Sequence, residues 1–159
     1  MAACTKSVDL PGTTAEGSDA SPPCGLFASG QIENILNVPV DSLQLRGRPV
    51  LAGMQMCAAG SQGSSAAWGV LKKAVTTRLK EYERINQGYL EDVRVNGRPA
   101  SWDRRMGTLV VRAEDMAIGV RLRVEKPILK KNQTPPEYLK DTASRLAGNM
   151  IQQLSNERS

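Results

Sequence analysis

The three cysteines, Cys4, Cys24 and Cys57, are the side chains of this sequence best suited to covalent chemistry. Three thiols in an exported domain leave one unpaired, which needs an explanation. A disulfide between Cys24 and Cys57 and a lipid on Cys4 account for all three, and such a bridge predicts a location outside the reducing cytosol. In the alternative, a cytosolic protein, all three remain thiols and Cys57 is a small buried apolar side chain.

Arginines form the second group with a clear chemical preference. If the strands expected below pair with one another, several arginine side chains project from one face of the sheet and make a basic patch. The arginines considered for this patch are Arg98, Arg104, Arg105, Arg112, Arg121 and Arg123. Five of them, all except Arg105, are our predicted binding residues, for phosphate headgroups, acidic glycans or the acidic surface of a partner protein. The alternative is a solvated or salt-bridged surface without a ligand.

Catalytic chemistry is disfavoured by what the sequence lacks. Histidine is absent, which removes the commonest general base and the commonest zinc ligand. The carboxylates Glu81, Glu83, Glu91 and Asp92 lie on or beside an expected helix, where solvation of the helix surface is the simplest interpretation. The Gly- and Ser-rich segment 61–65 lacks the lysine of a phosphate-binding loop. We therefore predict a non-enzymatic protein without a metal or cofactor.

The N-terminal segment predicts a lipid anchor. Ala2, Ala3 and Cys4 resemble the end of a bacterial lipobox, in which a signal peptidase cuts before the cysteine that receives the lipid. Met1 stands where that motif usually has Leu, and the given sequence shows no charged and apolar signal-peptide stretch before Cys4. Residues 1–23 are rich in Ser, Thr, Gly, Pro, Ala and Asp, which predicts a disordered tether. The Ala-Ala-Cys triplet, the polar tether and the pair Cys24 and Cys57 together favour a membrane-anchored protein.

Chain length and hydrophobic periodicity predict one α+β domain over residues 24–155. The sequence has 159 residues, and no apolar run in it approaches the roughly 20 residues that span a bilayer. Helices are expected over 29–37, capped by Ser29, over 76–86, with Leu79, Tyr82 and Ile85 facing a sheet, and over 137–154. Strands are expected over 54–58, 66–70, 92–95, 100–104, 108–112 and 116–125. Loops are expected over 41–52, with at most a short strand in that segment, over 60–65 and over 127–136. This order of elements argues for an antiparallel sheet covered by helices.

Several short motifs are similar to those of small actinobacterial envelope lipoproteins, whose shared domain has no assigned activity. The resemblance rests on Pro-Cys-Gly-Leu at 23–26, Leu-Asn-Val-Pro-Val at 36–40, the second cysteine Cys57, and Val-Asn-Gly-Arg-Pro-Ala at 95–100. Asn37 replaces the glycine usual in the family, and a second glycine near Arg98 is missing. The resemblance implies an exported, lipid-anchored protein with a disulfide and a fold related to the α/β sandwiches of the PsbP type, and it implies no catalytic residues.

Two classes of function follow from these observations. The first is a membrane-tethered envelope protein that binds an envelope partner, an anionic lipid or glycan, or an amphiphile. The second is a cytosolic nucleic-acid-binding module that uses the same arginines. The net charge of +5 permits contact with polyanions, but the basic residues are interleaved with Asp and Glu, a pattern that is weak support for nucleic-acid binding. We expect the first class, located on the extracytoplasmic face of the cell membrane.

Overall fold

The structure, a computed structural model, describes residues 23–36, 39–40, 43–45, 48–61, 63–125 and 127–158. Its helical segments are the 3-10 helix η1 (Pro23–Leu26) and the α-helices α1 (Ser29–Leu36), α2 (Val75–Ile85) and α3 (Pro135–Arg158). Its strands are β2 (Gln44–Leu45), β3 (Gln55–Ser61), β4 (Ser64–Leu71), β5 (Leu90–Val95), β6 (Arg98–Asp103), β7 (Thr108–Ala113) and β8 (Met116–Arg123).

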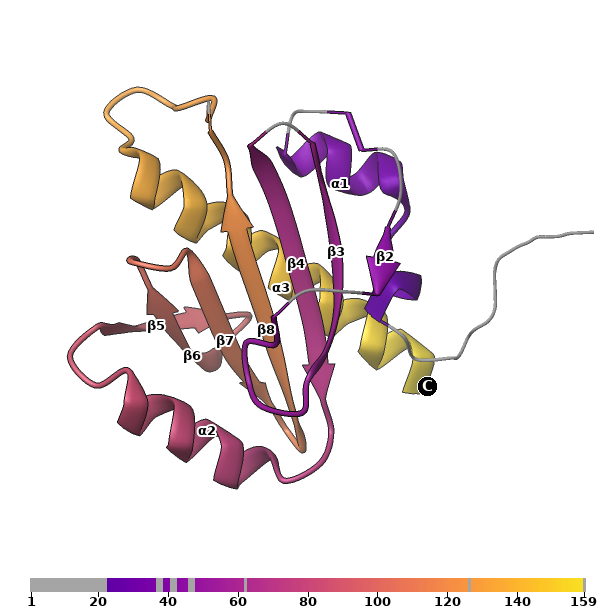
Figure 1. Ribbon diagram of the computed structural model, residues 1–159, viewed down its shortest axis with the longest axis vertical. Helices are drawn as coiled ribbons and strands as arrows, with labels where there is room; N and C mark the ends of the chain where they lie inside the picture. Colours follow the sequence, from indigo (N-terminus) through magenta and orange to yellow (C-terminus); the bar gives the residue numbers. More distant parts are fainter. Residues whose placement is uncertain are drawn as a thin grey trace, which may run out of the picture.

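The seven strands form one antiparallel sheet in the order β2-β3-β4-β8-β7-β6-β5 (Figure 1). The sheet is built from two sets of neighbours in the chain, β2-β3-β4 and β5-β6-β7-β8, which meet where β4 pairs with β8. The last strand therefore returns to the centre of the sheet, and α2 is the connection between the two sets. The expected α+β class is confirmed.

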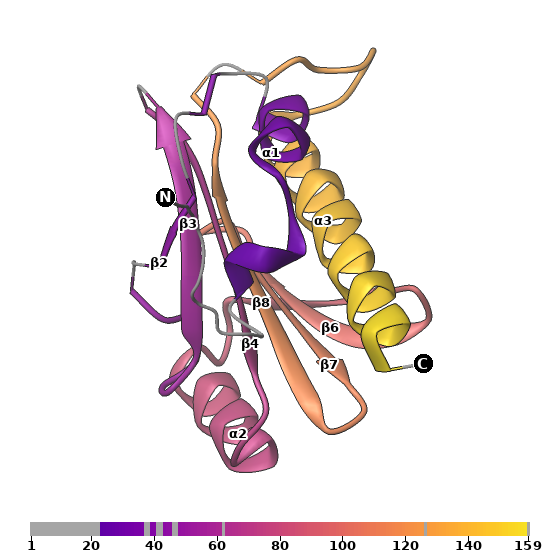
Figure 2. The same cartoon turned by 90° about the vertical axis from the view of Figure 1, so that its right-hand side faces the viewer.

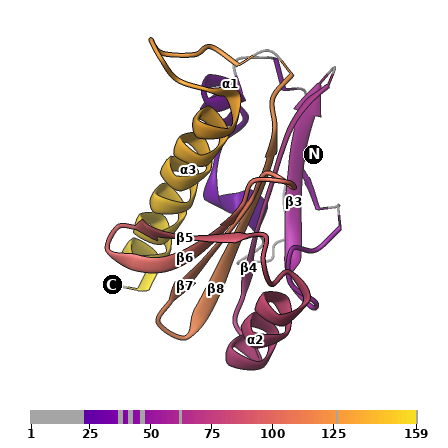
Figure 3. The ribbon, with the colours of Figure 1, turned by 90° about the vertical axis from the view of Figure 1, so that its left-hand side faces the viewer.

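Helices cover both faces of the sheet, and they do so unequally. Figure 2 shows η1, α1 and the long α3 on one face, and Figure 3 shows α2 on the opposite face. We call these the α3 face and the α2 face. Because successive side chains of a strand point to opposite faces, even-numbered and odd-numbered residues of β8 belong to different layers. Ile118, Val120 and Leu122 accordingly lie in the core under α3, whereas Ala117 lies in the core on the α2 face.

The main core fills the space between the sheet and α3. Trp68 of β4 and Trp102 of β6 are its largest side chains, exposed by 0% and 2%. Ala143, Leu146 and Met150 form one stripe of α3 that packs there, and each of these residues is completely buried. A chain with few aromatic residues thus places both of its tryptophans in one core, on separate strands.

A smaller core on the α2 face depends on two glycines. Gly69 of β4 and Gly119 of β8 are directly opposite each other, and the segment leading into β3 packs over them. A Cβ on Gly69 would lie 2.6 Å from the carbonyl oxygen of Gln55, and one on Gly119 would lie 3.0 Å from the Cβ of Val50. The absence of side chains there lets residues 50–54 lie close to the sheet.

The first hairpin extends beyond its expected length, because the segment 60–65 is not a loop. Gly60 pairs with Ser65 and Ser61 pairs with Ser64, so that only residues 62 and 63 connect β3 to β4. Composition misled the prediction: Gly and Ser are typical of loops, but the pairing register of the preceding strand residues continues through them. The strand expected over 116–125 is shorter and ends at Arg123.

The first residues of α1 and α3 differ from two further expectations. Ser29 is the first residue of α1 and not its cap, and the backbone N–H of Ala28 instead donates to the side-chain oxygen of Gln31 at 2.7 Å. The helix α3 begins at Pro135, before the expected residue 137, because proline suits a first helical turn. Thr134 and Glu137 form a reciprocal capping box there, with hydrogen bonds that lower the pKa of Glu137.

Two further expectations concern α2 and the N-terminal segment. Leu79 and Tyr82 pack on the sheet as expected, but Ile85 is 63% exposed. Pro23, which we assigned to the tether, is buried as the first residue of η1. Residues 1–22, including Cys4, lie outside the described residues.

Candidate functional site

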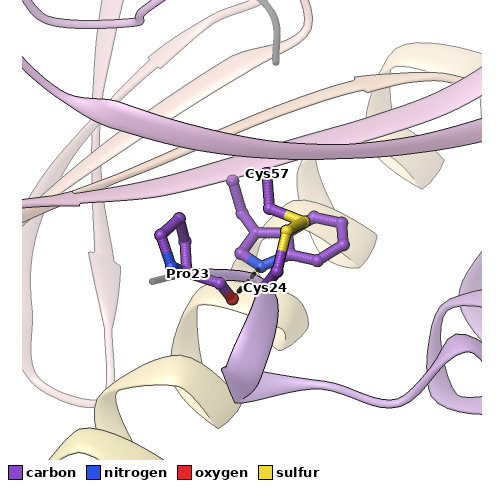
Figure 4. The surroundings of a disulfide bond; sticks show 4 residues. Pro23, Cys24 and Cys57 are labelled. Carbon is purple, nitrogen blue, oxygen red and sulfur yellow. Dashed lines mark hydrogen bonds between the residues drawn. A yellow bond between two sulfur atoms is a disulfide. The ribbon is translucent and has the colours of Figure 1, made fainter. Parts of the chain in front are cut away.

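The disulfide between Cys24 and Cys57 is present, as the sequence predicted (Figure 4). It joins η1 to β3 across a Cα–Cα distance of 5.1 Å, which lies in the usual range for such bonds. Cys57 is completely buried, and Leu45 of the edge strand β2 pairs with it. The bond therefore links η1, the first described element, to the sheet from within the core.

Trp68 makes a second set of contacts with the segment that the disulfide joins to β3. Its indole N–H donates to the carbonyl oxygen of Pro23 at 2.8 Å, and its ring meets that of Phe27 edge-on at a centroid distance of 5.6 Å. Trp68 is also the residue directly opposite Cys57 in the β3–β4 pair. One buried tryptophan thus contacts both sides of the segment that the disulfide holds.

The predicted basic patch is present in part. Residues directly opposite in a ladder point to the same face, so the pairing assigns each strand arginine to a side. Arg112 is opposite Ala117, Arg121 is opposite Thr108, and Arg123 is opposite Ser65, which places all three on the α2 face. Arg98 is opposite Val95, a residue of the main core, and so belongs to the α3 face. Arg104 is exposed in the turn between β6 and β7.

On the α2 face, Arg121 lines a hollow that Arg112 and Arg123 do not line. This hollow, which we call the α2 groove, lies between the segment 48–52 and the C-terminal half of α2 and has a volume of about 380 Å³. Its basic residues are Arg48, Arg78, Arg105 and Arg121, and its acidic residues are Glu81 and Asp103. A volume of this size falls at the lower end of the range of about 300–1,000 Å³ usual for small-molecule sites.

Both carboxylates of the α2 groove are already paired. Glu81 accepts from Arg78 at 3.4 Å, and Asp103, only 1% exposed, accepts from Arg105 at 3.1 Å and from the backbone N–H of Met106. Arg105 also donates to the side-chain oxygen of Asn86. The acidic charges of the groove are therefore balanced locally, at its α2 side and at its β6–β7 turn.

Arg121 is held by neutral groups. Its Nη1 donates to the carbonyl oxygen of Arg48 at 2.9 Å, and its Nε donates to the hydroxyl of Thr108 at 3.4 Å. Burial lowers the pKa of Arg121, Tyr82 opposes this change, and the like charge of Arg48 lowers the pKa further. In the described part of the chain, neither Arg121 nor Arg48 has a carboxylate within ion-pair distance.

Tyr82 of α2 is the half-buried group between these charges. Burial raises the pKa of Tyr82 to about 12, the Asp103 carboxylate raises it too, and Arg121 and Arg105 oppose the shift. The folded-state pKa thus lies above the ordinary value of about 10. The stability that the neutral phenol contributes is complete below pH 10, the unfolded-state value, and is lost as the pH rises through 12.

We expect Tyr82→Phe to remove this pH dependence. In the unmodified protein the free energy of unfolding should fall between pH 10 and pH 12 more steeply than in the variant. Absorbance at 295 nm should show a tyrosine ionisation near pH 12 that is lost in Y82F and retained in the matched control Tyr138→Phe. A late titration that persists in Y82F contradicts the assignment.

An apolar rim lies at the end of the α2 groove. Ile85 and Met106 line the groove and are 63% and 47% exposed. Tyr89, 56% exposed, lies against the Arg105 guanidinium, whose carbon is 3.9 Å from the ring centroid. Three large apolar side chains therefore remain open to solvent beside a cluster of arginines.

Sequence reasoning missed Arg48 and Tyr82 as members of this site. Arg48 falls in a segment expected to be a loop with at most a short strand, and Tyr82 was expected only to pack on the sheet. The Arg-Pro pair at 48–49 does not single out Arg48, because Arg98 and Pro99 form the same pair. Nothing in the sequence indicates that Tyr82 lies within the electrostatic range of Asp103, because that proximity depends on how α2 lies on the sheet.

In the part of the chain that the structure describes, no cluster of three or more Cys, Asp or Glu side chains is suited to holding a metal ion. No helix of the described segments combines the length and apolar character needed to cross a bilayer. Comparisons with protein-family models, with curated proteins and with solved structures found no match.

Proposed function

We propose that this chain is a lipid-anchored protein of the cell envelope, located on the extracytoplasmic face of the membrane, that binds a partner and catalyses no reaction. The observation that carries the proposal is the Cys24–Cys57 disulfide, completely buried at Cys57. Structural disulfides persist in oxidising compartments and are rare in the cytosol. A buried bond between η1 and β3 therefore supports an address beyond the plasma membrane.

The N-terminal sequence supports the anchored form of this address. Cys4 follows two alanines, as the acylated cysteine of a lipobox does, and about twenty residues separate it from Cys24. The motifs shared with the small envelope lipoproteins support the same assignment. We also propose that the seven-stranded sheet is a variant of the PsbP-type sandwich, on the basis of that resemblance.

The binding role is supported by the α2 face. The α2 groove has four arginines and two carboxylates in its lining, and both carboxylates are paired. Arg112 and Arg123 extend positive charge along the same face, although Arg112 also donates to the hydroxyl of Thr76. This distribution suits an anionic partner: an acidic protein surface, an anionic lipid or glycan, or a charged amphiphile.

The address is tested in the native host by expression from the protein's own gene. We expect incorporation of an alkyne-labelled palmitate and recovery in the membrane fraction. Cys4→Ser should abolish the label and release the protein, whereas Ser7→Ala, in the same segment, should change neither. Label or membrane recovery that persists in C4S contradicts the lipid anchor.

A thiol titration separates the envelope protein from the cytosolic alternative. Protein isolated from the host without reductant and then denatured should show no free thiol at Cys24 or Cys57. The cytosolic nucleic-acid-binding module predicts free thiols at all three cysteines and binding to DNA or RNA that weakens steeply with salt. That pair of results would replace the proposed function.

A further inference from the structure

We propose that the α2 groove binds an amphiphile with an anionic head, the head held between the guanidinium groups of Arg121 and Arg48 and the apolar chain lying over Ile85, Met106 and Tyr89. This inference rests on the binding role proposed above and assigns its ligand class. The shared chemistry is a phosphate or carboxylate joined to a single alkyl chain.

The charge balance of the α2 groove identifies the position of the head. Of the four arginines, Arg78 and Arg105 are already paired with Glu81 and Asp103. The remaining two, Arg48 and Arg121, are close enough for one to lower the pKa of the other. Two neighbouring cations without a described carboxylate repel each other, and an anion between them turns that repulsion into two attractions.

The Arg121 guanidinium is preorganised to bind an anion. A guanidinium has five N–H donors, and the two hydrogen bonds to Arg48 and Thr108 occupy one each on Nη1 and Nε. Three donors therefore have no partner among the described residues, including both on Nη2. The two existing bonds fix the plane of the group, so binding costs little side-chain entropy.

The apolar rim of the groove indicates where the alkyl chain of the ligand lies. Ile85 and Met106 line the same groove as Arg121 and are among the most exposed large apolar side chains of the described residues. Tyr89 continues this surface through its contact with Arg105. An inorganic anion would leave the rim exposed, and a long polyanion would need more than one confined basic site. A single-chain amphiphile uses both halves.

The first experiment is calorimetric titration of the folded chain with dodecyl phosphate below its micelle concentration. We expect saturable binding of one molecule, with inorganic phosphate binding at least tenfold more weakly and dodecyltrimethylammonium not at all. Equal binding of inorganic phosphate would show that the rim takes no part and would overturn the amphiphile. Absence of dodecyl phosphate binding would overturn the site.

Matched variants locate the two halves of the ligand. Arg121→Gln should weaken binding by about tenfold or more, because charge-assisted hydrogen bonds are lost. Arg123→Gln, two residues along the same face of β8 and outside the groove, should leave it unchanged. Arg48→Gln, at an exposed position, should weaken binding as well and keeps the test valid if R121Q fails to fold.

The apolar half has its own pair of variants. Ile85→Gln should weaken dodecyl phosphate binding by roughly fivefold but leave phosphate binding unaffected, since only apolar contact is removed. Ile128→Gln is the control, because Ile128 is also 63% exposed but lies in the loop before α3. An equal loss of dodecyl phosphate affinity in both variants would overturn the assigned position of the alkyl chain.

Vesicles containing phosphatidic acid distinguish a free amphiphile from a membrane surface. Binding to vesicles that survives I85Q and falls equally in R121Q and R123Q would indicate a diffuse basic surface and overturn the groove. All these titrations use protein without a lipid, so they are independent of Cys4. A cytosolic address with intact binding would refute the proposed function alone, whereas an anchored protein without binding would refute this inference alone.

Discussion

Removal of the Cys24–Cys57 disulfide by the double substitution C24A/C57A is expected to lower the free energy of unfolding by about 3–4 kcal/mol. The bond closes a loop with a sequence separation of 33 residues, so its loss restores much conformational freedom to the unfolded chain. Cys57 is completely buried, and its truncation also leaves a small cavity. Urea unfolding followed by circular dichroism measures the difference.

Comparison with the reduced protein separates the crosslink from the cavity. Reduction of the unmodified chain opens the loop without removing a buried atom, so it should reproduce most of the loss seen in C24A/C57A. Cys4→Ser, which leaves the bond intact, should be as stable as the unmodified protein. A reduced protein of unchanged stability would show that η1 is held by its other contacts alone.

Only some features of the fold could be predicted from the sequence. The Cys24–Cys57 pairing and the presence of a terminal helix follow from residue types and spacing, and both were predicted correctly. The strand order did not follow, because nothing local shows that β8 inserts between β4 and β7. The extension of β3 and β4 through Gly60 and Ser65 also depends on the partner strand, so composition alone gave the wrong answer.

The candidate site shows the same division. Alternation along a strand puts Arg121 and Arg123 on one face of β8, but it could not place Arg98 on the other side of the sheet without the β5–β6 register. Predicting the α2 groove from the sequence would require the relative positions of three elements: α2, the β6–β7 turn and the segment 48–52. The Arg121 side chain reaches the backbone carbonyl of Arg48 because residues 50–54 lie close over Gly119, a contact between segments about 70 residues apart.

Trp68→Ala is expected to lower the free energy of unfolding by about 3–5 kcal/mol, the range for truncating a large buried aromatic side chain. Trp68 is completely buried, and its loss removes the hydrogen bond to Pro23 and the ring contact with Phe27. Both contacts hold the segment that the disulfide also holds. Trp102→Ala, which truncates the other tryptophan of the same core, should cost a similar amount.

The two tryptophans should differ in their coupling to the disulfide, which a double-mutant cycle measures. In W68A the segment 23–27 loses its hydrogen bond and its ring contact with Trp68, so reduction should cost a different amount than it does in the unmodified protein, by about 1 kcal/mol or more. Three strands separate Trp102 on β6 from Cys57 on β3, so the effects of W102A and reduction should simply add. Equal coupling for both would mean that the loss is general to the core, and that Trp68 has no special part in holding η1 against the sheet.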